Sequence, residues 1–263
     1  MTGPPFRVLV VTAHPDDMEF GAGGTLAVWA DRGAEVTLAI ATDGSTGTQD
    51  RALMGDALGA VRLEETRRAA EIVGIAEVVW LGYRDGYLEY TLDLRREVAR
   101  LFRTYRPHRF MVLDPSSTID DRFINHPDHR AVGQACLDVS MTAGTTPGHF
   151  PELLDEGLEP WRGLREVWVM GPGLRPVAVD VGATIDRKIE ALLCHESQVG
   201  KDADEVSGWV RTSAAETGEA HGVAFAESFR VISQGPGFHT GEQSEDLGSD
   251  FEMVPADPRA ART

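Results

Sequence analysis

Two short clusters of histidine and aspartate are the most chemically capable part of this chain of 263 residues. Residues 14–17 read HPDD directly after an apolar run, and residues 126–129 read HPDH at the start of a stretch with helical character. A spacing of three residues at a strand-to-helix turn lets His14 and Asp17 converge on one point. An imidazole and a carboxylate are good ligands for a borderline cation such as Zn²⁺. Together the clusters can supply two histidines and one aspartate to a metal ion.

A purely structural role explains these residues incompletely. One aspartate is enough to cap a helix, so a cap accounts for one of Asp16 and Asp17 and leaves the other and His14 without a purpose. Three protein ligands with an open position define a catalytic zinc site. Metal-bound water titrates near ~7, a neighbouring carboxylate can take its proton, and an imidazolium can stabilise an oxyanion. The clusters therefore contain the parts of an amide hydrolase, although spacing does not decide whether His126 or His129 binds the metal.

Glycines after the first cluster raise a competing interpretation, a dinucleotide-binding loop. Gly21, Gly23 and Gly24 follow a predicted strand and open a predicted helix. Leu26 stands where the third glycine of the G-x-G-x-x-G pattern belongs, and the acidic residues beside this segment would repel a pyrophosphate. We therefore expect the glycines to let the helix approach the sheet closely.

Short β-branched runs alternate with amphipathic stretches, which is typical of βαβ units around a mainly parallel sheet. The predicted strands are residues 7–12, 35–41, 77–81, 109–113, 166–170 and 177–180. Polar residues follow the first four strands directly, at the edge where open α/β sheets bind their ligands. We therefore predict an α/β fold with a Rossmann-like, mainly parallel sheet flanked by helices, as a single domain with an elaborated C-terminal edge.

Apolar residues spaced three and four apart predict the helices. The strongest pattern runs from Leu94 to Tyr105, and a weaker one from Val61 to Val73 ends at Gly74. A helix with Phe20 and Leu26 on its apolar face follows the first strand. Further helices are expected from Pro127 toward Met141, over 184–194 and over 204–216.

The charge balance restricts the partners of this protein. Asp and Glu number 42 against 25 Lys and Arg, a net charge of −17. Because nucleic acid and anionic lipid require a basic stripe, and the sequence has none, neither is expected as a partner. The apolar run at Val8–Ala13 is too short to span a membrane, so we expect a cytoplasmic protein. A homo-oligomer is compatible with the sequence.

The C-terminal segment differs from the rest of the chain. Residues 234–263 are rich in Gly, Pro and acidic residues and lack apolar periodicity, which is typical of a disordered tail. The expected division is therefore a domain over 1–233 followed by this tail.

The motifs resemble those of the PIG-L/LmbE-like zinc-dependent de-N-acetylases. Residues 13–19 (AHPDDME) with 23–25 (GGT) resemble the family's opening motif, and 126–130 (HPDHR) resemble its second metal motif. The supporting similarities extend to about residue 232, and they are Thr42 to Ser45 with Gly47, Arg62 with Glu65, 81–86 (LGYRDG), Lys188, 195–198 (HESQ) and 226–229 (AESF).

The resemblance implies a role for each motif residue. It implies that His14, Asp17 and His129 bind zinc, and that Asp16 is the general base. It also implies that His126 is the electrophile or general acid. Asp128 would orient His126. Arg62 and Asp85 match positions that resemble substrate contacts in some members, whereas a helix-face ion pair and a turn are their structural alternatives.

Two departures narrow the expected substrate. Thiol-sugar deacetylases of the family carry an aromatic hydroxyl shortly before the HPDH segment, where this chain has Phe123, Ile124 and Asn125, and several carry Glu where this chain has Met18. Both differences favour the branch that acts on N-acetylglucosamine-type sugars. The leading hypothesis is therefore a zinc hydrolase that removes an N-acyl group from a GlcNAc-like amino sugar. The alternatives are an amidase for a thiol-sugar conjugate or glycosylated secondary metabolite, and a non-catalytic sugar-binding protein.

Overall fold

The strands of this chain form one twisted sheet, shown in a computed structural model that describes residues 6–116, 119, 124–171, 176–233 and 253–254. Within those residues the sheet has eight strands in the order β3-β2-β1-β4-β5-β7-β6-β8. The first five in this order are mutually parallel, and the remaining neighbours pair antiparallel. The mainly parallel α/β sheet expected from the sequence is therefore confirmed.

The parallel half of the sheet is built from the buried apolar runs that the sequence marks as strands. Its strands are β1 (Arg7–Thr12), β2 (Glu35–Thr42), β3 (Glu77–Tyr83), β4 (Arg109–Val112) and β5 (Glu166–Met170). In β1 and β4 nearly every residue is buried, because helices cover both faces of a parallel sheet. β1 lies at the centre, between β2 and β4.

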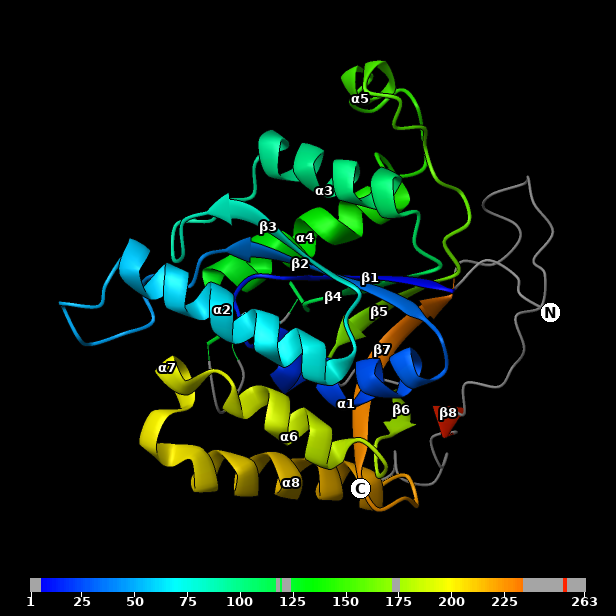
Figure 1. Cartoon of the computed structure of the whole chain (residues 1–263). Helices are drawn as coiled ribbons and strands as arrows, with labels where there is room; N and C mark the ends of the chain where they lie inside the picture. Colours follow the sequence, from blue (N-terminus) through cyan, green and yellow to red (C-terminus); the bar gives the residue numbers. More distant parts are fainter. Residues whose placement is uncertain (1–5, 117–118, 120–123, 172–175, 234–252, 255–263) are drawn as a thin grey trace.

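Helices cover both faces of the sheet (Figure 1). On one face lie α1 (Asp17–Asp31), α2 (Asp56–Val73), α6 (Ile185–Leu193) and α8 (Ala203–Glu219). On the other lie α3 (Leu92–Tyr105) and α4 (Pro127–Met141), which pack against each other. The apolar stripe predicted for α3 is buried at Leu94, Val98 and Phe102. The structure also has the short helices α5 (Glu152–Asp155), α7 (Glu196–Val199) and η1 (Gly200–Asp202).

The C-terminal edge contains a strand that the sequence analysis did not predict. β7 (Ala226–Ser233) inserts between β5 and β6 (Val177–Asp180) and pairs antiparallel with both. Most of the predicted tail, 234–263, lies outside the described residues. Its two described residues form β8 (Met253–Val254), which pairs with β6.

The glycines of α1 are explained by close packing. A Cβ atom on Gly24 would lie 2.9 Å from Val181 Cβ, and one on Gly21 would lie 2.6 Å from Met170 Sδ. Val181 is β-branched and cannot move its Cβ away, so the close approach of α1 to the C-terminal edge of the sheet requires glycine at position 24. At position 21 the end of the flexible Met170 side chain would have to shift. None of the helices in the described part of the chain is long and apolar enough to cross a membrane.

Candidate metal centre

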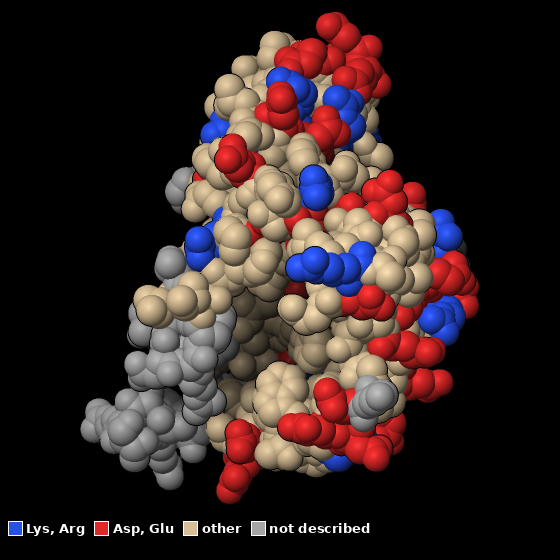
Figure 2. All heavy atoms as spheres, turned by 90° about the vertical axis from the view of Figure 1, so that its left-hand side faces the viewer, with Lys and Arg blue, Asp and Glu red and all other residues tan. Residues whose placement is uncertain are grey.

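The two histidine-aspartate clusters meet at the carboxyl ends of the central strands. His14 follows β1. His126 is the N-cap of α4 and residues 127–129 lie in its first turn, and α4 contacts β1 and the neighbouring β4. Figure 2 looks onto this end of the molecule, and a hollow opens in the middle of the face. The strand order of the sheet reverses between β1 and β4. Open α/β sheets bind their ligands at such a switch point, outside the carboxyl ends of the strands.

The structure brings His14, Asp17 and His129 together as one potential ligand set. His14 Nδ1 lies 3.1 Å from His129 Nε2, and His129 Nε2 lies 3.1 Å from Asp17 Oδ1. In a tetrahedral site with metal–nitrogen bonds of about 2.0 Å, ligand atoms are about 3.3 Å apart. The three side chains therefore fit a divalent cation with little rearrangement.

The backbone of the β1–α1 turn fixes the orientation of Asp17. Its Oδ2 accepts hydrogen bonds from the N–H groups of Ala13 and His14, at 3.0 and 2.8 Å. Burial would raise the pKa of Asp17, but interactions with His129 and His14 outweigh it and hold the pKa well below its usual range. The carboxylate therefore stays ionised, and its Oδ1 faces the two imidazoles.

The second nitrogen of His14 faces two further carboxylates. His14 Nε2 lies 3.1 Å from Asp85 Oδ1 and 3.4 Å from Asp128 Oδ2. Burial would lower the pKa of His14, but interactions with Asp128, Asp17 and Asp85 raise it to about 11. Histidine ligands commonly direct their other N–H at a carboxylate, which fixes the tautomer and the ring orientation. His14 therefore has the surroundings of a metal ligand that binds through Nδ1.

Both of these carboxylates are held by backbone and hydroxyl donors. Asp85 Oδ2 accepts from the N–H and the hydroxyl of Thr46, at 3.0 and 2.7 Å. Asp128, fully buried, accepts from the N–H groups of Gly86 and Leu88. The structure thus places Asp85 against His14, and it places the Asp128 carboxylate against His14 and not in a hydrogen bond with His126.

Asp16 lies beside the ligand set and is bound by Arg62. Arg62 Nη2 donates to Asp16 Oδ2 at 2.9 Å, and the guanidinium also donates to the carbonyls of Pro15 and Gly44. Asp16 has a φ of 92°, a left-handed conformation that non-glycine residues adopt mainly where surrounding contacts enforce it. Burial raises the pKa of Asp16 to about 7, against the opposing effect of Arg62. Arg62 itself is only 3% exposed, so its guanidinium is held inside the protein by these contacts.

His126 stands at the N-terminus of α4. Its Nδ1 accepts the N–H of Asp128 at 3.3 Å, so in the neutral ring the proton resides on Nε2. The ring lies edge-on to that of His14, with 4.6 Å between centroids. Burial and the neighbouring His14 lower the pKa of His126. His126 can therefore donate a hydrogen bond from Nε2 to a group bound beside the ligand set.

The structure also shows supporting residues to which the sequence analysis gave no role in the site. Asp43 Oδ1 accepts the N–H groups of Ser45 and Asp85, and so joins the turn after β2 to the turn after β3. Glu19 and His195, both fully buried, face each other at 3.2 Å. The sequence contains a signal for two of these residues, because Asp43 comes directly after a strand and His195 opens the HESQ segment.

A family model and several known proteins match this chain. The model described as GlcNAc-PI de-N-acetylase (PIG-L) matches residues 9–140. A diacetylchitobiose deacetylase from Thermococcus kodakarensis is 33% identical, over 86% of this chain and 83% of the relative. A 1D-myo-inositol 2-acetamido-2-deoxy-alpha-D-glucopyranoside deacetylase 2 from Saccharopolyspora erythraea is 30% identical, over 74% and 84% of the two chains.

The fold agrees with the sequence comparison. The solved structure of N,N'-diacetylchitobiose deacetylase from Pyrococcus horikoshii superimposes with a TM-score of 0.81 and 30% identity, covering 88% of this chain and 85% of that one. Fold and matched motifs together define the class of protein, an N-deacetylase. The chain belongs to the PIG-L family.

Proposed function

We propose that this chain is a zinc-dependent hydrolase that removes the N-acetyl or a related N-acyl group from the 2-amino group of a GlcNAc-like amino sugar or sugar conjugate. The observation that carries the proposal is the convergence of His14, Asp17 and His129 beside the separately held Asp16. The names of the relatives support an amino-sugar substrate. The sequence over 1–233 would then form the catalytic domain.

Each residue of the site would have its own role in the reaction. His14, Asp17 and His129 would hold the zinc ion, which when bound supplies Lewis acidity toward water and the amide carbonyl. Asp16 would accept the proton of the attacking water, because Arg62 occupies its Oδ2 and leaves Oδ1 available. His126 would donate a hydrogen bond from Nε2 to the developing oxyanion. The proton that Asp16 takes from the water would then pass to the leaving amine. Asp85 and Asp128 would orient His14.

The intact ligand set argues against a non-catalytic sugar-binding protein. A binding protein needs neither a candidate base held in a left-handed conformation nor three converging metal ligands. Arg62, expected at the sequence level as a substrate contact, would act at least as a positioning residue for Asp16, since its guanidinium joins Asp16 to the turns after β1 and β2.

Acetate release and metal content measured on the same samples test this function. The zinc-loaded protein should release acetate and a free amine from GlcNAc or N,N'-diacetylchitobiose. Asp16→Asn should keep about one zinc per chain while its turnover falls about 10²- to 10⁴-fold, because only the proton acceptor is lost. Undiminished turnover of Asp16→Asn with zinc bound would show that Asp16 is not the base.

A further inference from the structure

The turn after β3 joins the metal centre to an exposed arginine-tyrosine pair. The N–H of Tyr87 donates to the carbonyl of Arg84 at 3.2 Å, which closes a β-turn. Gly86, third in the turn, has a φ of 80°, the conformation that favours glycine at that position. Asp85, second in the turn, faces His14. The inner residues of the turn therefore support the centre, while its outer residues lie on the rim.

Tyr87 has an exposed side chain on a fixed backbone. The N–H groups on either side of it in the chain, those of Gly86 and Leu88, both donate to the buried carboxylate of Asp128. Leu88 is buried, whereas Tyr87 is 67% exposed. A single exposed aromatic residue is common on protein surfaces. An exposed ring whose two chain neighbours are both hydrogen-bonded to a metal-centre carboxylate is placed for contact with whatever binds there.

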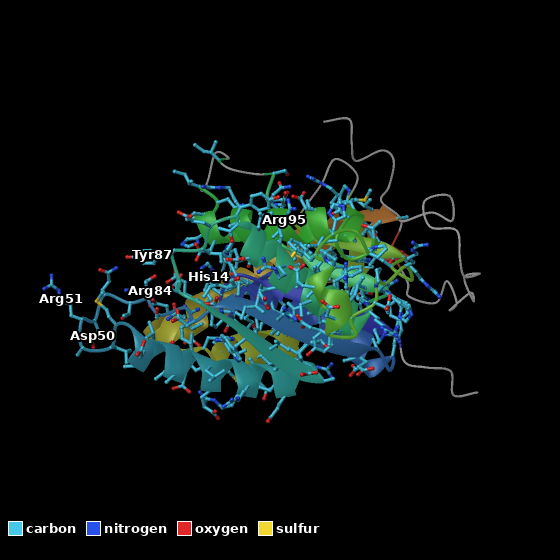
Figure 3. All side chains as sticks on the ribbon, turned by 90° about the horizontal axis from the view of Figure 1, so that it is seen from above. His14, Asp50, Arg51, Arg84, Tyr87 and Arg95 are labelled. Atoms are coloured by element: carbon cyan, nitrogen blue, oxygen red, sulfur yellow. The ribbon has the colours of Figure 1, made fainter. Side chains whose placement is uncertain are left out.

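Arg84 holds the ring from one side. Its guanidinium carbon lies 4.7 Å from the centroid of the Tyr87 ring, a distance that favours cation–π attraction. In the described part of the chain Arg84 has no salt-bridge partner, although acidic residues outnumber basic ones. Figure 3 shows Arg84 and Tyr87 next to each other at the same end of the sheet as His14. The donors of Arg84 are therefore available to a ligand at the rim.

A nearby tyrosine shows the contrast. Tyr90, 43% exposed, donates its hydroxyl to Asp138 and accepts a hydrogen bond from Arg95 at 3.0 Å. The two helices α3 and α4 thus account for the position of Tyr90. For Tyr87 the corresponding contact within the described residues is Arg84, from the same turn.

We propose that Tyr87 and Arg84 form a subsite for a second ring, the sugar or polyol attached to the amino sugar whose N-acyl group is removed. This inference rests on the proposed function and narrows its substrate class to conjugates. Tyr87 stands two residues from Asp85, and two residues span at most about 7 Å, so Tyr87 lies within reach of a ring attached to a sugar bound at the metal centre. The apolar C–H face of that ring would lie on Tyr87, and Arg84 would donate to its oxygens.

Kinetics with one-ring and two-ring substrates test the subsite. Tyr87→Ala should raise KM for N,N'-diacetylchitobiose roughly three- to tenfold, as expected for one lost ring contact, with kcat nearly unchanged. KM for GlcNAc should not change. Tyr87→Phe should behave like the unaltered protein, and Tyr90→Ala, the matched control, should leave both KM values unchanged. Equal KM increases for both substrates would overturn the proposal.

Binding measurements separate failure of the subsite from failure of the proposed function. In zinc-loaded Asp16→Asn, calorimetry should show tighter binding of N,N'-diacetylchitobiose than of GlcNAc, and adding Tyr87→Ala should remove the difference. This result would support the subsite even if no substrate were hydrolysed. Equal binding of the two sugars would overturn the subsite and leave the hydrolase proposal intact. Binding of GlcNAc 1-phosphate that requires Arg84, tested by Arg84→Gln, but not Tyr87 would replace ring stacking by recognition of an anion.

Discussion

Two groups of buried charge lie against the same helix, α1, and they are completed in different ways. Lys188 and Glu227 form an ion pair at 2.6 Å, with each side chain about 5% exposed. Lys188 also donates to the carbonyl of Phe20, and Glu227 accepts the N–H groups of Gly24 and Thr25. This pair is neutral overall and satisfied by contacts within the protein, which is what a buried ion pair requires.

The group at the N-terminus of α1 has a surplus of negative charge. Asp17, Asp85 and Asp128 surround His14, and among the described residues Asp16 is the one member of the group with an arginine partner. Carboxylates at such distances repel one another unless a cation lies between them. Burial of charge alone therefore does not mark a functional site. A functional site is marked by a group of carboxylates that still needs a cation, because the protein supplies these ligands without neutralising their charge.

The largest effect is expected when a ligand is removed from the incomplete group. Asp17→Ala should lose the metal and lower turnover about 10³-fold or more, since the Lewis acid goes with it. Metal analysis after dialysis, paired with acetate release, measures both quantities. Treatment of the unaltered protein with a chelator should give the same loss, and added zinc should restore it there but not in Asp17→Ala. Full turnover of metal-free Asp17→Ala would contradict the assignment.

Breaking the closed pair should instead affect stability. Lys188→Met leaves Glu227 buried without its cation and should lower the free energy of unfolding by about 3–5 kcal/mol. Glu227→Gln added to Lys188→Met should recover part of this loss, because the unpaired charge is removed. Denaturant unfolding measures the change, and the folded variants should still bind one metal ion per chain. Loss of metal from well-folded Lys188→Met would mean that the two groups are coupled through α1.

Local patterns in the sequence predicted the parallel half of the fold well. The bounds of β1 were predicted without error, because a buried parallel strand is a continuous apolar run. β7 was missed because its position between β5 and β6 depends on antiparallel pairing over long sequence separations. Phe20 was expected on the apolar face of α1, yet it is 40% exposed and packs edge-on against the ring of Trp209. Tertiary contacts therefore determine the position of β7 and the surroundings of Phe20, which local periodicity does not predict.

The candidate site was predicted in its residue types but not in all of its contacts. His14 and Asp17 share one turn, so their convergence follows from spacing. The partners of Arg62 and Asp85 do not follow from spacing. Arg62 lies 46 positions from its partner Asp16, and Asp85 lies 71 positions from its partner His14. Both had been expected as substrate contacts, and each touches a residue of the metal centre. Only the assembled turns after β1, β2 and β3 show this.

The smallest expected effect tests whether Asp85 belongs to the incomplete group or only to its turn. Asp85→Asn keeps the size of the side chain but removes the charge that faces His14 Nε2, so metal affinity should fall about 10- to 100-fold, as for other carboxylate partners of ligand histidines. Competition with a chelator of known affinity measures this change. Thr46→Val, which removes one hydrogen bond to Asp85 but leaves the carboxylate, should weaken metal binding less. If Asp85→Asn bound metal as tightly as the unaltered protein while KM rose, Asp85 would act on the substrate. The charge that demands a cation would then come from Asp17 and Asp128.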